Sequence, residues 1–356
     1  SSSMEDERNQ ESSDESDDFK SEWPYVNAIR KGIASLSRPG TFACGGVLIE
    51  DAINLHIKVK GVGTIKLPLS NKQGKLLKSK CIAAPYGLGS ETLVNKLVRD
   101  AWQVDAKDVK LDKELNRLIR KEIQEIISIL MGDSFNGNQV IAELYKLVYY
   151  EKGGHFVARR DTEKAPGMFA TLVVQLPADH TGGALIVRHK DQTKVFDFED
   201  DSINTYFFAA FFADCEHELR EVTSGHRLVL LYNLINKNTH TNFNPKIDDS
   251  IKLNNKQNVM ITMKNSVDEW QSDDRGPQHL ALKLDHLYTD TNTSFCTLKG
   301  KDKFIADVLC LCSDVEVYLA TLTKSETRRI CGYDPYGLEP IPDDDEVDPE
   351  VFIHIQ

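Results

Sequence analysis

The residues with the clearest chemical potential lie between residues 149 and 227, in a fixed order. The stretch YYEKGGHFVARRDTEK, residues 149–164, contains Tyr150, a pair of glycines, an aromatic residue, Arg159 and Asp161. His217 follows, and Arg227 lies ten positions after it. Aspartate and histidine are metal-ligand types, and an arginine fork binds carboxylates in a bidentate way. Motifs of other chemistries, such as G-x-S-x-G, H-E-x-x-H or a Walker lysine loop, are absent.

This ordered set resembles the 2-oxoglutarate- and iron(II)-dependent oxygenases, and in particular their branch similar to prolyl 4-hydroxylases. The pattern of that branch is a tyrosine, two glycines, an aromatic residue and His-x-Asp, followed by a distal histidine and a basic residue ten positions beyond it. The resemblance covers roughly residues 140–235. The earlier stretches FACGG, APYGLGSETL and DAWQVD match a eukaryotic subgroup of these proteins more loosely.

The resemblance implies an iron(II) ion and 2-oxoglutarate as cofactors. Asp161 and His217 match the metal-ligand positions, and Arg227 matches the residue that binds the far carboxylate of 2-oxoglutarate. Tyr150 is expected to add a hydroxyl to the same acid. Such sites hold iron with two imidazoles and one carboxylate on one face. Residues two apart on a strand point to the same side, so position 159 and Asp161 are expected to face one ion together. A peptide or protein is the implied substrate class.

Arg159 stands where the family pattern has a histidine. A guanidinium stays protonated and offers no lone pair to a metal. At about 4 Å and an effective dielectric near 20, one pair of unit charges is worth about 4 kcal/mol, and a dication roughly doubles that figure. Arg159 therefore opposes metal binding, and we expect it to bridge to Asp161. Val157 and Ala158 also depart from the pattern, which favours natural divergence over a single designed change.

Three other histidines are candidates for the missing imidazole. His155 shares a strand face with Arg159 if the strand is regular, but it lies about 13 Å from Asp161 along an extended chain. His226 is next to Arg227 and is expected to point to the opposite face. His180 lies in a predicted turn. We therefore expect all three to be structural or solvated.

Three functions remain open at this stage. The first is a hydroxylase that uses iron(II) and 2-oxoglutarate to oxidise a C–H bond of a peptide, protein or other substrate. The second is a catalytically inactive oxygenase fold, a pseudoenzyme, that acts as a binding module. The third is an unrelated scaffolding domain in which the order of the residues is chance. Arg159 leaves open whether the chain is an enzyme.

The elements around these residues predict an α+β fold with a double-stranded β-helix, or jelly roll, as its core and helices before it. Six short segments rich in β-branched and aromatic residues fall between residues 142 and 235, separated by Gly, Pro, Asp or Asn clusters. Residues 112–132 predict an amphipathic helix with Asp112 as its N-cap and Gly132 as its stop. Flanking predictions are a helix at 23–36, strands within 47–69, and a turn leading into a helix at 84–93.

We divide the chain into four segments and assign the chemistry to the third. They are an acidic disordered tail at 1–22, an α/β support region at 23–137, the double-stranded β-helix core at 138–236 and a C-terminal extension at 237–356 packed on the core. The extension is expected to begin with a polar loop over 236–258. Its predicted elements are a helix at 301–312, a strand at 315–322 and a last strand at 351–356.

Charge and composition narrow the partners. The net charge is −12, of which residues 1–18 contribute −7. An acidic chain of this kind is not expected to bind nucleic acid. No run of 18 apolar residues is present, so we expect no membrane span. The seven cysteines do not form paired C-x-x-C motifs. Together with an N-terminal stretch lacking an apolar signal core, this predicts reduced thiols in an intracellular protein of the cytoplasm or nucleus.

Overall fold

The chain forms two compact units, Ser1–Leu36 with Leu253–Pro277, and Ser37–Lys252 with Gln278–Gln356. The computed structural model describes residues 23–34, 40–49, 55–88, 91–132, 140–161, 164–237, 254–289, 293–310, 316–322 and 350–355. The predicted acidic tail at 1–22 lies outside these residues. The two units do not follow the four predicted segments, because residues distant in sequence pack together in the smaller one.

The smaller unit pairs α1 (Pro24–Ala34) with α4 (Asn254–Gln271). Helix α1 agrees with the predicted helix at 23–36, whereas α4 begins inside the segment predicted as a loop. Met263, Val267 and Trp270 are buried on α4 at spacings of four and three, which places them on one helix face. The Trp270 indole donates a hydrogen bond to the Pro277 carbonyl at 2.5 Å and so ties the end of α4 to the following segment.

An eight-stranded antiparallel sheet forms the centre of the larger unit. Its order is β1-β16-β12-β18-β10-β8-β4, with β13 paired to β18. All nine residues of β12 are buried, because this strand lies in the middle of the sheet and both of its faces are covered. The strand bounds are β1 (Ala43–Ile49), β4 (Ile82–Ala83), β8 (Trp102–Asp105), β10 (Val140–Glu151), β12 (Met168–Leu176), β13 (His180–Gly182), β16 (Tyr206–Phe212) and β18 (Val222–Asn236).

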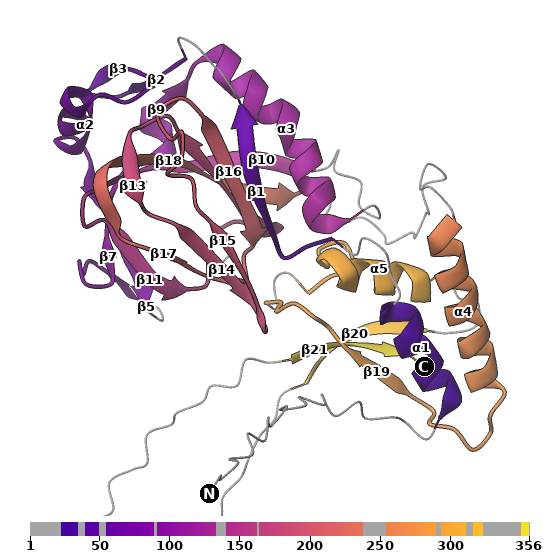
Figure 1. Cartoon of the computed structure of the whole chain (residues 1–356). Coiled ribbons are helices and arrows are strands. Elements are labelled where there is room, and N and C mark those ends of the chain that lie inside the picture. The colour runs from indigo at the N-terminus through magenta and orange to yellow at the C-terminus, as the bar shows by residue number, and fades with distance from the viewer. Residues whose placement is uncertain are drawn as a thin grey trace, which may run out of the picture. The chain divides into compact units, whose positions relative to one another are not determined.

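A five-stranded sheet lies against the first, in the order β15-β14-β17-β11-β7 (Figure 1). Its strands are β7 (Arg99–Asp100), β11 (His155–Arg159), β14 (Leu185–His189), β15 (Gln192–Phe196) and β17 (Glu216–Leu219). The ring of Phe211 on β16 lies 4.7 Å from the ring of His217 on β17, so the two sheets face each other. All six predicted β-segments are strands. The mostly antiparallel architecture with few helices is consistent with the predicted jelly roll.

Helix α3 (Lys113–Met131) packs against β1 and β16, as Figure 1 shows. The carboxylate of Asp112 accepts hydrogen bonds from the backbone N–H groups of Glu114 at 2.8 Å and Leu115 at 3.4 Å. Gly132 ends the helix with a φ of 74°, a conformation that favours glycine. The apolar side chains at helical spacing face the sheet. This helix, its cap and its stop are as predicted.

The remaining elements surround the two sheets. The helix predicted after residues 84–93 is wrong: β5 (Tyr86–Leu88) and β6 (Glu91–Leu93) form a hairpin, and the Asn95 side chain then accepts a bond from the Leu97 N–H in a turn. The predicted C-terminal helix and strands are present as α5 (Gly300–Leu309), β20 (Val317–Leu322) and β21 (Glu350–Ile355). Further elements are β2 (His56–Val59), β3 (Gly63–Lys66), β9 (Val109–Leu111), β19 (Leu280–Lys283), α2 (Asn71–Lys78) and the short helix Ala106–Asp108.

None of the helices described is both long and apolar enough to cross a bilayer.

Substitutions at two adjacent glycines on β1, Gly45 and Gly46, can measure how tightly the two sheets pack. A Cβ at Gly45 would lie 2.6 Å from Phe196 Cδ1 on β15 and 2.7 Å from the Phe208 carbonyl oxygen. A Cβ at Gly46 would lie 4.0 Å from Phe208 Cε1, at ordinary contact distance. We predict that Gly45→Ala lowers the free energy of unfolding by about 1–3 kcal/mol, because it must separate packed groups.

The matched control is Gly46→Ala, which we expect to change stability by less than about 1 kcal/mol, in the stabilising direction. Urea unfolding followed by circular dichroism measures both. Equal losses at the two positions would show that the glycines serve β1 itself and not the approach of the sheets.

Candidate functional site

A bulge in β11 turns Arg159 toward the interior. Phe156 pairs with Leu219 and Arg159 pairs with His217, so three residues of β11 advance against two of β17. Val157 and Ala158 are both exposed between them. In a regular strand, Phe156 and Arg159 would face opposite sides. The bulge instead places both on the face that carries the buried His217.

Asp161 and His217 meet as the motif predicts. Asp161 Oδ1 lies 3.7 Å from His217 Nε2, and Asp161 Oδ2 accepts a hydrogen bond from the Thr171 hydroxyl at 2.7 Å. His217 is 3% exposed, and its Nδ1 is 3.2 Å from the Cys215 carbonyl. A neutral ring that donates from Nδ1 presents the lone pair of Nε2 toward Asp161.

The charge states of this pair follow from its surroundings. Burial acts to raise the pKa of Asp161, but His217 and the Thr171 hydrogen bond hold that pKa below its usual value. Burial lowers the pKa of His217; Asp161 opposes this shift and Arg159 adds to it. At neutral pH the pair is therefore a carboxylate beside a neutral imidazole.

Arg159 does not form the expected bridge to Asp161. Its guanidinium carbon lies 5.0 Å from the centre of the Phe156 ring, and its Nε is buried without a hydrogen-bond partner. The described ion pairs of Asp161 include His217 and not Arg159. Burial lowers the pKa of Arg159, and neighbouring Arg99 adds to that shift, whereas Asp161 opposes it. The guanidinium thus interacts with Asp161 electrostatically but leaves both carboxylate oxygens to other groups.

These side chains do not fit an iron ion. Within the described ranges, no third His, Cys, Asp or Glu comes close enough to Asp161 and His217 to complete a metal-ligand group. The residue at the third position is a permanent cation, which opposes a dication through charge repulsion. Aspartate and histidine alone leave the two-histidine, one-carboxylate set incomplete.

The three alternative histidines have partners elsewhere. His155 contacts the carbonyl oxygens of Gly153 at 2.8 Å and Leu97 at 3.3 Å. His180 is buried and contacts the Ala178 carbonyl at 3.0 Å, while His226 Nδ1 is 2.8 Å from the Tyr149 hydroxyl. Their structural assignment agrees with the sequence-based expectation.

Arg227 is a buried cation whose orientation is fixed. It lies on β18 directly across from Tyr150 on β10 and is 2% exposed. Its Nε donates to Gln175 Oε1 at 2.9 Å, and the Gln175 amide is itself held by a hydrogen bond to the Phe198 carbonyl at 3.0 Å. Its guanidinium carbon lies 5.7 Å from the Tyr150 ring.

A carboxylate ligand fits Arg227. Burial lowers the pKa of Arg227 to about 10, so the side chain stays charged at neutral pH. No acidic side chain lies within ion-pair distance of it among the residues described. Gly183, with a φ of 74°, leaves the space beside it: a Cβ there would lie 3.1 Å from Arg227 Cδ. The absence of a side chain at Gly183 therefore makes room for the arginine stem.

Two further basic residues, Arg99 and Lys146, lie near Arg159, and no sequence motif predicted that they belong to the site. Arg99 on β7 is 5% exposed, and its guanidinium carbon lies 6.0 Å from the Phe156 ring. Lys146 on β10 is buried and donates to Gln103 Oε1 at 2.9 Å. Burial, together with Arg99 and other cations, lowers the pKa of Lys146 to about 8. The β7–β11 pairing that places Arg99 beside Phe156 cannot be read from local sequence.

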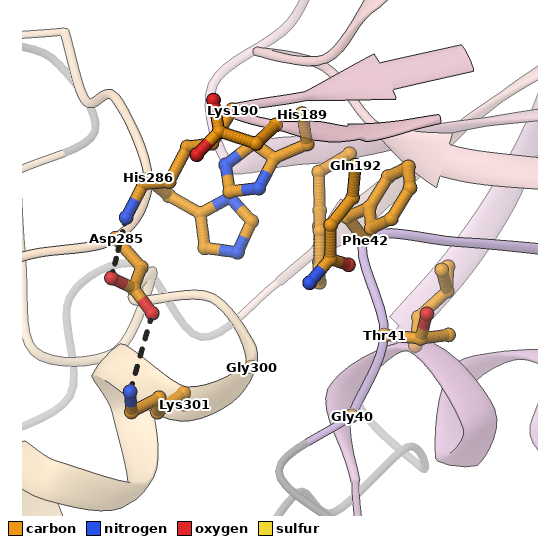
Figure 2. A pocket seen from close by; sticks show the side chains of 13 residues that line it. Gly40, Thr41, Phe42, His189, Lys190, Gln192, Asp285, His286, Gly300 and Lys301 are labelled. Atoms are coloured by element: carbon orange, nitrogen blue, oxygen red, sulfur yellow. Dashed lines mark hydrogen bonds and ion pairs between the residues drawn. The ribbon is translucent and has the colours of Figure 1, made fainter. Parts of the chain in front are cut away.

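A second unpredicted cluster surrounds Asp214, which follows β16. Asp214 Oδ2 lies 3.0 Å from His286 Nδ1 and 3.8 Å from His189 Nε2, and the Lys299 ammonium donates to Asp214 Oδ1 at 2.9 Å. The imidazoles of His189 and His286 stack with centres 4.6 Å apart. Both line a cavity of about 300 Å³, where Figure 2 also shows Asp285 paired with Lys190 and Lys301.

His189, Asp214 and His286 have metal-ligand types within reach of one another, but Lys299 already neutralises the carboxylate. Burial acts to raise the pKa of Asp214, yet His286 and Lys299 hold it well below its usual value. The backbone N–H of Leu287 also donates to Asp214 Oδ2 at 3.2 Å. We therefore interpret the cluster as a buried ion network that attaches the segment around His286 to the ends of β14 and β16.

No known protein family and no curated protein matches the sequence. Solved structures similar to this chain include an oxidoreductase of the 2OG-Fe(II) oxygenase family and prolyl hydroxylases.

Three such structures differ in how much of the chain they cover. An oxidoreductase of the 2OG-Fe(II) oxygenase family from Burkholderia pseudomallei is 17% identical with a TM-score of 0.30, covering 46% of this chain and 78% of its own. A prolyl hydroxylase from Trichoplax adhaerens, in complex with a hypoxia inducible factor oxygen degradation domain peptide fragment, is 14% identical with a TM-score of 0.36, covering 61% and 94%. A Pseudomonas putida prolyl-4-hydroxylase is 12% identical with a TM-score of 0.31, covering 59% and 99%. Because these identities and TM-scores are low, the side chains of the site carry the evidence for function.

The Asp214 network gives a stability prediction. Lys299→Met should lower the free energy of unfolding by roughly 3–5 kcal/mol, because it leaves a buried carboxylate without its cation. Lys301→Met is the control: its ammonium lies 3.6 Å from Asp285 and is 33% exposed, so the loss should stay below about 1 kcal/mol. Urea unfolding at neutral pH measures both variants. Similar small losses would contradict the network's role.

Proposed function

We propose that this chain is an oxygenase-fold protein that binds 2-oxoglutarate, or a similar short dicarboxylate, and acts as a binding module without iron chemistry. In this proposal the two facing sheets are the two sheets of a double-stranded β-helix, and the acid lies between them. A peptide or protein is the partner class that the prolyl-4-hydroxylase-like motif set implies.

The observation that carries the proposal is the buried, carboxylate-free guanidinium of Arg227. A buried charge without a counter-ion costs several kcal/mol, so such a group is expected to receive its partner from a ligand. The Gln175 contact uses Nε and leaves the Nη atoms for a bidentate carboxylate. Tyr150 lies directly across the strand pair, with the centre of its ring 5.7 Å from the Arg227 guanidinium carbon.

The position and charge of Arg159 are the reason why we propose a function without iron chemistry. It lies directly opposite His217 on the strand pair, so its positive charge stands beside the Asp161–His217 pair. Because the guanidinium cannot lose its proton near neutral pH, no ordinary change of conditions converts it to a ligand. The residues present thus bind acids better than they bind cations.

A second candidate function is an iron(II)- and 2-oxoglutarate-dependent hydroxylase. It is favoured by one observation: the Nε2 lone pair of His217 and the ionised Asp161 face each other at 3.7 Å, as two ligands of one cation do. This candidate requires the Arg159 side chain to leave its place on Phe156 and a further ligand to enter.

Acid binding through Arg227 is tested without metal. We predict that purified protein in EDTA binds 2-oxoglutarate, and that Arg227→Met weakens this binding roughly 10- to 100-fold, as expected for loss of a charge-assisted bidentate pair. Arg188→Met is the control, because Arg188 pairs with Glu216 and Glu218 away from Arg227. Isothermal titration calorimetry measures all three proteins. Equal affinity in the Arg227 variant would remove the proposed acid site.

Metal binding is tested at Arg159. Anaerobic titration with Mn(II) or Fe(II) should show little binding by the natural sequence and at least tenfold tighter binding by Arg159→His, because the substitution adds an imidazole and removes a charge. Arg159→Gln separates these effects, since it removes the charge alone. The gain should disappear in Arg159→His combined with Asp161→Ala. Tight binding by the unmodified protein would favour the hydroxylase instead.

A further inference from the structure

Two guanidinium groups lie against the same aromatic ring inside the larger unit. Arg99 is the direct strand partner of Phe156, and the β11 bulge places Arg159 on the same face. Their guanidinium carbons are 6.0 Å and 5.0 Å from the centre of the Phe156 ring. Both distances are within the usual cation–π range, so the ring holds two cations near each other.

Both arginines have hydrogen-bonding capacity that the described residues do not use. Arg99 is 5% exposed, and its Nε is buried without a partner. Its Nη1 donates to the Pro85 carbonyl at 3.1 Å. The Nε of Arg159 is likewise buried and without a partner. Buried donors in native proteins are nearly always paired, so two such atoms on guanidinium groups that share the Phe156 ring indicate an acceptor that the described residues do not supply.

The surrounding charges point to the sign of that acceptor. Arg99 is close enough to Arg159 to lower its pKa, and both arginines act in the same direction on Lys146. Asp161 is the acid that faces Arg159, but its oxygens lie against His217 and Thr171. The cations Arg99, Arg159, Lys146 and Lys164 therefore outnumber the two carboxylates that act on them, Asp161 and Asp105.

We infer that Arg99 and Arg159 form an oxyanion-binding site beside Phe156, which binds a carboxylate or phosphate group of a ligand without a metal ion. This inference deepens the proposed function but does not depend on Arg227. The guanidinium forks match the planar oxygens of either group. Tyr150 lies across the β10–β18 strand pair from Arg227, and one dicarboxylate reaching both arginines and two separate anions are both compatible with the arrangement.

The test uses the full chain in EDTA with sodium sulfate and succinate as probes. Calorimetry and thermal unfolding are measured for the natural sequence, Arg99→Gln, Arg159→Gln and Arg227→Met. Arg160→Gln is the matched control, because Arg160 is the exposed neighbour of Arg159. We expect sulfate to bind and raise the unfolding temperature of the natural sequence. Its affinity should fall at least tenfold in the Arg99 and Arg159 variants, and stay unchanged in the Arg160 variant.

Ligand-free stability separates this site from a structural role. Without anion, Arg159→Gln should unfold at the same or a higher temperature, because it relieves repulsion from Arg99 and breaks no described hydrogen bond. A lower unfolding temperature together with unchanged sulfate affinity would show that the guanidinium serves packing and would overturn the inference. Failure of sulfate to bind the natural sequence would overturn it as well.

Succinate binding distinguishes one dicarboxylate that spans Arg159 and Arg227 from two separate anion sites. Loss of succinate affinity in both Arg159→Gln and Arg227→Met supports one dicarboxylate that spans both arginines. Loss of succinate affinity in Arg227→Met alone, with sulfate still dependent on Arg99 and Arg159, supports two separate subsites. If neither anion depends on Arg99 or Arg159 while 2-oxoglutarate still depends on Arg227, this inference fails and the proposed function stands.

Discussion

A permanent positive charge opposite His217 is the constraint on which the rest of the site depends. The β11 bulge places Arg159 there, and the Phe156 ring supports its guanidinium at 5.0 Å. A guanidinium keeps its proton at any physiological pH, so it repels a dication and attracts an acid under all ordinary conditions. Together with the buried Arg227, this charge is the basis of our proposal that the space between the sheets receives carboxylates rather than metal.

Much of the fold could be predicted because its signals are local. The 3.6-residue spacing from Leu115 to Leu130, with Asp112 and Gly132 at the ends, defines α3 without tertiary information. The β-rich segments between 142 and 235 are separated by clear turn residues. Helix α4 was missed because its apolar positions, Met263, Val267 and Trp270, are scattered among Asn and Lys residues that also suit a loop. Its burial comes from packing on α1, which is distant in sequence.

The site also has features that the sequence predicts and features that depend on contacts between distant segments. The motif order predicted that Asp161 and His217 meet and that Arg227 lies beside Tyr150, because matched spacing carries the register of a known pattern. Neither the bulge nor Arg99 could be predicted, since both depend on how β11 pairs with strands far away in sequence. The bulge also explains why Arg159 does not bridge to Asp161: Phe156 turns inward and stacks with the guanidinium. The Asp214 network depends on contacts between distant segments too.

The charges decide between an ion and an acid at this position. The charges that act directly on the neutral His217 are the positive charges of Arg99 and Arg159 and the negative charge of Asp161. A dication would gain from Asp161 but lose to both arginines, with each unit pair worth about 4 kcal/mol at contact distance in an effective dielectric near 20. A dianion reverses every one of these signs, so its two attractions outweigh its one repulsion. Replacing Arg159 by histidine removes one of the two repulsions on a metal and adds a ligand, so in the proposed function this single position decides between a metal and an acid.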